Sequence, residues 1–265
     1  MPAFLTRPVR FLPNGIADAV ANLAIVMAAY WIYRYSRGMV DYEMAASTAF
    51  ANADWIISVE RALHLDMEHA MQSIAHGVPG LSDASSFMYI NFQSTVTFGA
   101  MAYIYAAHNR AFGFVRNMFI VAWFLALVCY VVVPTAPPRL VPGLGIEDSV
   151  AAFTGIDPES HSVSKLFNPY AAVPSMHVGF AMMIGIPLAR LSKHRPVRIF
   201  WALYPLAVTY VVMATGNHFF LDAVFGAMAV GVAALTARKL GQLRPHAWQF
   251  GELGEQPSPA PEAAS

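Results

Sequence analysis

Apolar runs long enough to cross a membrane alternate with short polar segments along most of this chain. A helix needs about 20 predominantly apolar residues to span a bilayer. Six runs approach that length, and charged or proline-containing segments separate them. They are residues 16–33, 87–107, 118–133, 173–191, 199–214 and 219–237. The pattern predicts an all-α protein, a polytopic membrane bundle of six transmembrane helices.

The segment between the first and second runs differs, because charged residues interrupt the apolar ones at helical spacing. Residues 55–63, with the sequence Trp-Ile-Ile-Ser-Val-Glu-Arg-Ala-Leu, show this mixture. It is typical of helices that lie on a membrane surface. We expect one or two external amphipathic helices here, ended by the turn-forming residues 77–80 (Gly-Val-Pro-Gly).

Composition supports a membrane protein and excludes other classes. The chain is 57% hydrophobic and only 12% charged, whereas soluble domains carry about 25% charged residues. A net charge of zero gives no basic excess for binding nucleic acid. The one cysteine, Cys129, lies in an apolar run, where packing is its expected role.

The two ends of the chain differ from its apolar centre. Residues 1–15 are interpreted as a basic cytoplasmic tail, and the proline-rich residues 241–265 as a disordered cytoplasmic tail. Residues 16–240 are expected to form one membrane domain, since no internal repeat divides them. In the sixth run, Ala223, Ala227 and Gly231 recur every four residues, which predicts close helix packing along that stripe.

Basic residues predict the orientation, because they accumulate on the cytoplasmic side of membrane proteins. With an inside N-terminus and six spans, eleven of the 16 basic residues fall inside. They are Arg7, Arg10, Arg110, Arg116, Arg190, Lys193, Arg195, Arg198, Arg238, Lys239 and Arg244. Both termini are then cytoplasmic, and the expected location is the plasma (inner) membrane. The loop 135–172, the start of the fourth span and the end of the fifth meet at the exterior or periplasmic face.

Ionisable residues from separate runs converge at that outer face. His218 and Asp222 are four residues apart, so on a helix they share one face, and the carboxylate can fix the histidine tautomer. Pro174 suits a first helical turn, which places His177 near a helix N-terminus that favours an anion. Arg139 follows the third run and offers a permanently charged fork of donors to phosphate.

Other interpretations of these residues stay open. His218 and Asp222 could be a structural clip between helices, and Arg139 could be a snorkelling residue at the interface. Two histidines with an aspartate could also bind a metal. Against the metal, an adjacent arginine is unfavourable, and the four-residue spacing favours an orienting pair.

Two of these stretches resemble known signatures. Residues 174–177 (Pro-Ser-Met-His) and 218–222 (His-Phe-Phe-Leu-Asp) are similar to the second and third signatures of the type 2 phosphatidic acid phosphatase superfamily, roughly P-S-G-H and S-R-x5-H-x3-D. The chain departs from them at Met176 and at residues 211–212, where Val-Val replaces Ser-Arg. The first signature, a lysine followed by Arg-Pro, has only residues 137–139 (Pro-Pro-Arg) in its place. The pattern resembles most the inositol phosphorylceramide synthase-like (inositolphosphotransferase) branch, which transfers phosphorylated head groups between lipids.

The resemblance implies a metal-independent lipid phosphotransferase or lipid phosphate phosphatase that needs no cofactor and forms a phosphohistidine. It implies that His218 attacks phosphorus, that Asp222 orients it, and that His177 acts as acid and base. The substrate would be a phospholipid or a polyprenyl- or sphingolipid-type phosphate in the bilayer. The acceptor would be an alcohol or water.

Three further residues are expected to bind substrate. Arg139, Ser175 and the backbone N–H groups around Ser175 would hold the phosphoryl oxygens. Asn217 would cap the sixth helix or touch phosphate, with capping the expected role. The alternative function is an anionic-lipid transporter or scramblase that uses the same residues, although the runs show no paired interrupted helices.

The charge bias generates a prediction about topology. A reporter fused after Arg244 should read as cytoplasmic, and a reporter inserted near Asp157 should read as external. Protease protection or a compartment-sensitive enzyme fusion measures both. The reverse pattern would contradict the orientation and the side on which the site lies.

Overall fold

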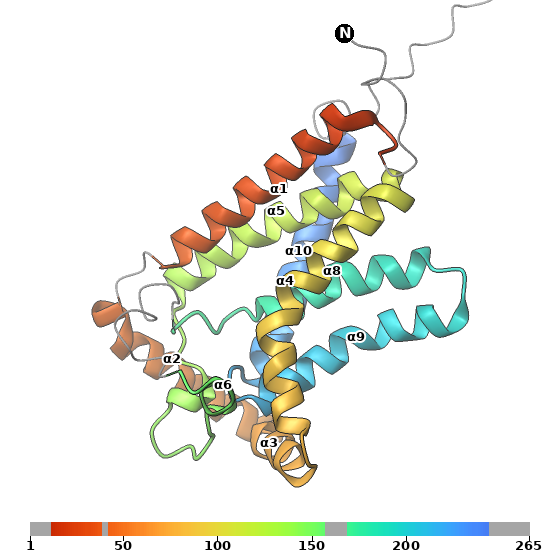
Figure 1. Cartoon of the computed structure of the whole chain (residues 1–265). Helices are drawn as coiled ribbons and strands as arrows, with labels where there is room; N and C mark the ends of the chain where they lie inside the picture. The colour runs from red at the N-terminus through yellow and green to blue at the C-terminus, as the bar shows by residue number, and fades with distance from the viewer. Residues whose placement is uncertain (1–11, 39–41, 157–168, 244–265) are drawn as a thin grey trace, which may run out of the picture.

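In the computed structural model, residues 12–38, 42–156 and 169–243 are described, and the described part is helical (Figure 1). Its elements are α1 (Gly15–Gly38), α2 (Tyr42–Leu63), α3 (Glu68–Gly77), α4 (Leu81–Ala107), α5 (Asn109–Val132), the short 3-10 helix η2 (Pro138–Leu140), α6 (Ser149–Thr154), α8 (Met176–Leu191), α9 (Arg195–Ala214) and α10 (Phe220–Leu243). The predicted all-α class is confirmed for these residues. Most of the two predicted tails lies outside the described residues.

Four helices of the described residues are long and apolar enough to cross a membrane: α1, α5, α9 and α10. This indicates an integral membrane protein. The predicted second and fourth spans correspond to α4 and α8. The α4 helix has 27 residues but polar side chains in its middle, and the apolar α8 has only 16 residues. The six-span plan therefore stays a prediction.

The segment between the first two spans forms α2 and α3, which confirms the predicted helices between them. Their break is also as predicted, since α3 ends at Gly77 and α4 begins at Leu81. Figure 1 shows α2, α3 and α6 gathered at one end of the bundle, opposite the first turn of α1. The last turn of α9 and the first turn of α10 lie at this same end.

The turn between α4 and α5 is shorter than predicted. Helix α5 begins at Asn109, so Arg116 lies two turns inside it rather than at the edge of a loop. The Arg116 side chain is only 2% exposed and donates to the side chains of Asn22 and Asn117. These amide oxygens allow an arginine within an apolar helix, because they replace its water. One of the eleven charges predicted to be cytoplasmic is thus buried between α1 and α5.

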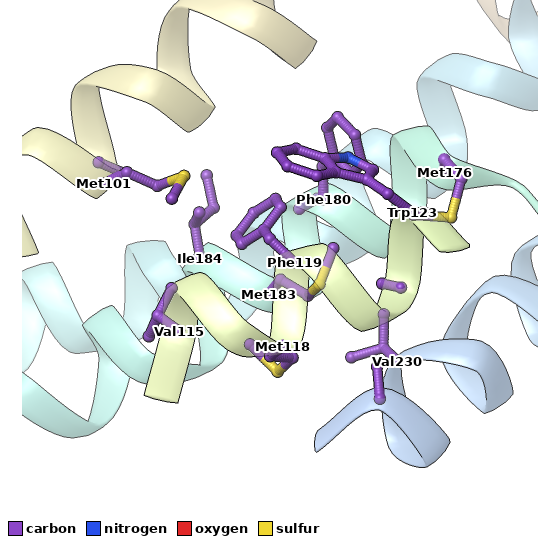
Figure 2. Close-up of a cluster of buried hydrophobic side chains, with 14 of the residues drawn as sticks. Met101, Val115, Met118, Phe119, Trp123, Met176, Phe180, Met183, Ile184 and Val230 are labelled. Atoms are coloured by element: carbon purple, nitrogen blue, oxygen red, sulfur yellow. The ribbon is translucent and has the colours of Figure 1, made fainter. Parts of the chain in front are cut away.

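Large apolar side chains from α5 and α8 fill the centre of the bundle (Figure 2). Phe119 and Phe180 meet edge to face with ring centroids 5.4 Å apart, and Trp123 contacts both rings. Met183 and Ile184 on α8 are fully buried beside them. This packing fixes how α8 lies against α5 and therefore the position of the first turn of α8.

Helix α10 packs through a different stripe from the one predicted. Ala227 is only partly buried and Gly231 is exposed. From Ala223 onward, the buried positions are Ala223, Gly226, Val230, Ala233 and Ala237. They alternate in steps of three and four residues, whereas a strict four-residue step drifts around an α-helix of 3.6 residues per turn. The close approach is made by Gly226, where an added Cβ would lie 2.5 Å from the Ser175 carbonyl oxygen.

This contact predicts unequal effects for two glycine substitutions on one helix. Gly226→Ala should lower the thermal midpoint by several degrees, because the new methyl group meets backbone and overpacking costs roughly 1–3 kcal/mol. Gly231→Ala is the matched control, since nothing lies within 4 Å of its added Cβ. The control should be neutral or slightly stabilising. Equal thermal midpoints for the two variants in detergent would contradict the close contact.

Candidate active site

Two loop segments are tied together at the end of the bundle that holds α2 and α3. The Thr135 N–H donates to the Tyr170 carbonyl at 2.8 Å, and the Ala172 N–H donates back to Thr135 at 3.4 Å. The Ala136 N–H donates to the Ala49 carbonyl on α2 at 3.0 Å. The segment after α5 and the segment before α8 are thereby held side by side, with α2 behind them.

The predicted His218–Asp222 pair is present. The His218 Nδ1 lies 3.2 Å from Asp222 Oδ2, and the two residues are 5% and 0% exposed. The same carboxylate oxygen accepts the Phe219 N–H at 2.9 Å. One detail differs from the prediction, because His218 precedes α10 rather than lying on it. The backbone N–H of His218 donates to the Val212 carbonyl. The contact spans the loop and the first turn of the helix.

His177 approaches this pair from α8. It is the second residue of that helix, and its ring centroid is 5.8 Å from the ring centroid of His218. Its other face is stacked on Tyr89 of α4, with centroids 4.1 Å apart and an interplanar angle of 21°. No feature of the sequence indicated Tyr89. The predicted proximity of His177 and His218 is confirmed, since residues 41 positions apart in the chain bring their rings together.

The N-terminus of α8 has no side-chain cap. Ser175 is the N-cap residue, is fully buried, and its Oγ has no hydrogen-bond partner among the described residues. The first N–H groups of a helix are left without intrahelical acceptors, and together with the helix dipole they favour an anion. Pro174 lies before the helix, so the predicted position of this proline in the first helical turn is wrong.

Arg139 is held beside the loop that carries His218. Its Nε lies 2.9 Å from Asp148 Oδ2, an ion pair without good hydrogen-bond alignment. Its Nη1 donates to the Asn217 side-chain oxygen, and its backbone N–H donates to the Gly216 carbonyl at 3.0 Å. Gly216 has a φ of 72°, and an added Cβ there would lie 2.6 Å from the Glu147 carbonyl. Only glycine fits this crossing of two loops.

Asn217 does not cap α10, so the capping interpretation is wrong. Its amide group donates to the carbonyl and hydroxyl of Thr215 at 3.1 and 3.0 Å, while its oxygen accepts from Arg139. The hydrogen bonds of the Asn217 side chain are therefore made to the turn and to the Arg139 guanidinium. It links Arg139 to the residue directly before His218.

Two carboxylates that the sequence did not single out cap α10 instead. The Phe220 N–H donates to Glu68 Oε1 at 2.8 Å, and the Leu221 N–H donates to Glu60 Oε1 at 2.7 Å. Glu60 is 1% exposed and Glu68 is 5% exposed. A signal was present for Glu60, because it continues the buried stripe of Ala49, Ala53 and Ile56 on α2 at steps of three and four residues.

The metal alternative requires several ligands that converge on one point. Within residues 12–38, 42–156 and 169–243, no three histidine, cysteine, aspartate or glutamate side chains are arranged to hold an ion. The geometry thus offers this alternative no support. It instead presents an oriented histidine, a second histidine, an uncapped helix N-terminus and a fixed arginine.

These features within an apolar helix bundle define a class, the membrane enzymes of the phosphatase or phosphotransferase type. A comparison with protein families matches residues 54–236 to the PAP2 superfamily, and the chain belongs to this superfamily. The match identifies the superfamily and not the inositol phosphorylceramide synthase-like branch. No curated protein and no solved structure matches the chain.

Proposed function

We propose that this protein hydrolyses or transfers the phosphoryl group of a membrane lipid phosphate through a phosphohistidine on His218. The observation that carries the proposal is the 3.2 Å contact of His218 Nδ1 with Asp222, with the His177 ring 5.8 Å away. In a member of the PAP2 superfamily, this arrangement supports nucleophilic catalysis by one histidine and proton transfer by the other.

In the first step, His218 Nε2 attacks phosphorus, and the bond from phosphorus to the lipid oxygen breaks. His177 gives its proton to that oxygen, so the lipid leaves as an alcohol. Asp222 accepts the hydrogen bond from His218 Nδ1–H and stabilises the positive charge that forms on the ring. Stacking of His177 on Tyr89 supports this role, because it fixes the plane of the proton donor.

In the second step, water or an alcohol attacks the phosphohistidine, and the phosphorus–nitrogen bond breaks. His177 takes the proton of the attacking hydroxyl group and returns to its starting state. Water as acceptor gives hydrolysis, and an alcohol gives head-group transfer. Transfer of an inositol phosphate head group is the finer form of the proposal, and it rests on the missing Ser-Arg pair at residues 211–212.

Phosphate binding is assigned to Arg139, Ser175 and the N-terminus of α8. An arginine with a fixed guanidinium plane matches phosphoryl oxygens, and Asp148 and Asn217 fix that plane here. The unpartnered Oγ of Ser175 supports a polar ligand at the helix end. We keep the exterior or periplasmic orientation as part of the proposal, on the basis of the positive-charge bias.

An apolar groove beside the site supports a lipid substrate. It has a volume of about 470 Å³ and is lined by residues of α2, α5 and α10, together with Val173 and Pro174. Pro174 directly precedes Ser175, so the groove and the proposed phosphate site share this segment of the chain. Its lining includes the exposed side chains of Met228 and Val232 on α10, a helix apolar enough to span the membrane. We assign the hydrocarbon tail of the substrate to this groove.

The first test is activity of the purified protein. With a long-chain lipid phosphate in mixed micelles, it should release inorganic phosphate or, with an alcohol present, form a new phosphodiester seen by mass spectrometry. Activity should survive a chelator, because Arg139 and helix N–H groups supply the positive field. Loss in chelator with recovery in a divalent cation would favour the metal alternative. Binding of lipid phosphate without turnover would favour a transporter or scramblase.

A second test separates the two histidines. A phenol with withdrawing substituents leaves without a proton, whereas a lipid alcohol needs one, and general acid catalysis contributes roughly 10²–10⁴-fold. His177→Ala should therefore lose most activity on lipid phosphate but still form phosphoenzyme with an activated aryl phosphate. His218→Ala should form no phosphoenzyme with either substrate. Asp222→Asn should fall between, because its amide orients the ring without stabilising the charge. Phosphorylation of His218→Ala but not of His177→Ala would reverse the assignment.

A further inference from the structure

Three consecutive N–H groups at the start of α10 are held by three carboxylates. Asp222 accepts from Phe219, Glu68 accepts from Phe220, and Glu60 accepts from Leu221, at 2.9, 2.8 and 2.7 Å. Asp222 belongs to α10 itself, but Glu60 comes from α2 and Glu68 from the first residue of α3. Carboxylates at a helix N-terminus are favoured by the helix dipole and by its unpaired N–H groups.

These three acceptors fix the conformation of residues 218–222, the segment that contains the proposed nucleophile. His218 and Asp222 stand at its two ends, and their 3.2 Å contact depends on the conformation of the turn between them. The turn has one internal anchor and two anchors on other helices. Loss of an outer anchor would let the first turn of α10 move and would change the distance from His218 to the α8 end.

The same anchors decide which helix end is available to an anion. The first N–H groups of α10 already have protein acceptors. The N-terminus of α8 has no side-chain cap, and the buried Ser175 hydroxyl beside it has no partner among the described residues. A phosphoryl group therefore finds N–H donors at α8 and carboxylates at α10. This asymmetry favours a phosphoryl group at the start of α8, beside His177, over one at the start of α10.

Glu60 and Glu68 also act on each other, because both are buried and they share a hydrogen bond. Burial raises the pKa of Glu60 to about 8, and the charges of Glu68 and Asp222 act in the same direction. Burial likewise raises the pKa of Glu68. The ionisable groups involved are Glu60 on α2, Glu68 on α3 and Asp222 on α10, with His218 bonded to Asp222. At neutral pH Glu60 therefore retains its proton.

We propose that Glu60 and Glu68 are positioning residues for His218, which set the first turn of α10 and direct the phosphoryl group to the N-terminus of α8. The inference rests on the proposed function of His218 as nucleophile. It assigns to α2 and α3 an indirect part in catalysis, through the loop before α10. Neither glutamate needs to touch the substrate.

The test compares alanine and glutamine at both positions in the full-length protein. Glu60→Ala and Glu68→Ala remove the acceptor oxygen, so kcat and the rate of phosphoenzyme formation should fall about 10–100-fold, the range expected for a nucleophile displaced by about 1 Å. KM should change less than about threefold, because Arg139 and the α8 end are untouched. Glu60→Gln and Glu68→Gln keep an amide oxygen for the helix N–H and should recover most of kcat. Asp54→Ala and Asp66→Ala, at exposed carboxylates, are matched controls.

The pH profile provides a readout that a purely structural clip would not give. Below about pH 8 Glu60 keeps its proton, and above about pH 8 its charge is opposed by burial and by the neighbouring Glu68 and Asp222. Wild-type kcat should therefore fall as the pH rises through about 8. Glu60→Gln removes the group that ionises near pH 8, so this fall should disappear in that variant.

The pair should also appear in the pH dependence of stability. Glu60 ionises near 4.5 in the unfolded chain but only near 8 in the folded chain. Its contribution to folding stability is thus fully present below pH 4.5 and lost as the pH rises through about 8. The thermal midpoint should follow this course in the wild type and not in Glu60→Gln.

The outcomes separate this inference from the proposed function. A wild type that forms no phosphoenzyme overturns both. An active wild type whose folded alanine variants keep wild-type kcat overturns the inference alone. If the alanine variants do not fold, Glu60→Gln decides, and an unchanged alkaline fall in this variant overturns the inference.

Discussion

One backbone hydrogen bond joins the two helix ends on which the site depends. The Ser175 N–H donates to the Asp222 carbonyl at 3.0 Å, so the residue before α8 is fixed to the first turn of α10. Gly226 makes this approach possible, because any side chain there would meet the Ser175 carbonyl. His177 and His218 come from segments far apart in the chain, and this bond helps to fix the distance between their rings. The core packing of α8 against α5 holds the same arrangement from the other side.

The helices that lie outside the apolar bundle complete the site. Gln72 on α3 donates to the Glu147 carbonyl at 2.9 Å and accepts the Glu147 N–H at 3.0 Å, so it fixes the loop that supplies Asp148 to Arg139. Asn52 on α2 donates to the Pro134 carbonyl at 2.7 Å. Loops inside a protein need acceptors and donors for their backbone groups. Here α2 and α3 provide them, which makes these two helices a frame for the loop after α5.

The sequence indicated the residues of the site that interrupt an apolar pattern. His177, His218 and Asp222 stand at the edges of apolar runs, so burial and chemistry could both be inferred from their positions. Glu60 and Glu68 lie among other charged residues, and charge in an amphipathic segment indicates solvent. Their burial depends on the packing of α2 against α10 and of α3 against α9, which is a tertiary effect. The capping role assigned to Asn217 failed for a related reason, since its partner Arg139 is 78 positions away in the chain.

The groove between α2, α5 and α10 changes how substrate concentration should be counted. Its walls are apolar, and several of them are exposed on helices that suit a bilayer. A lipid whose tail occupies it would arrive by diffusion within the membrane plane, so the relevant quantity is its mole fraction among neighbouring lipids. Diluting the surface with inert lipid would then slow turnover even when the total amount in the tube is constant. Bystander lipids with similar tails would act as competitive inhibitors without any phosphate of their own.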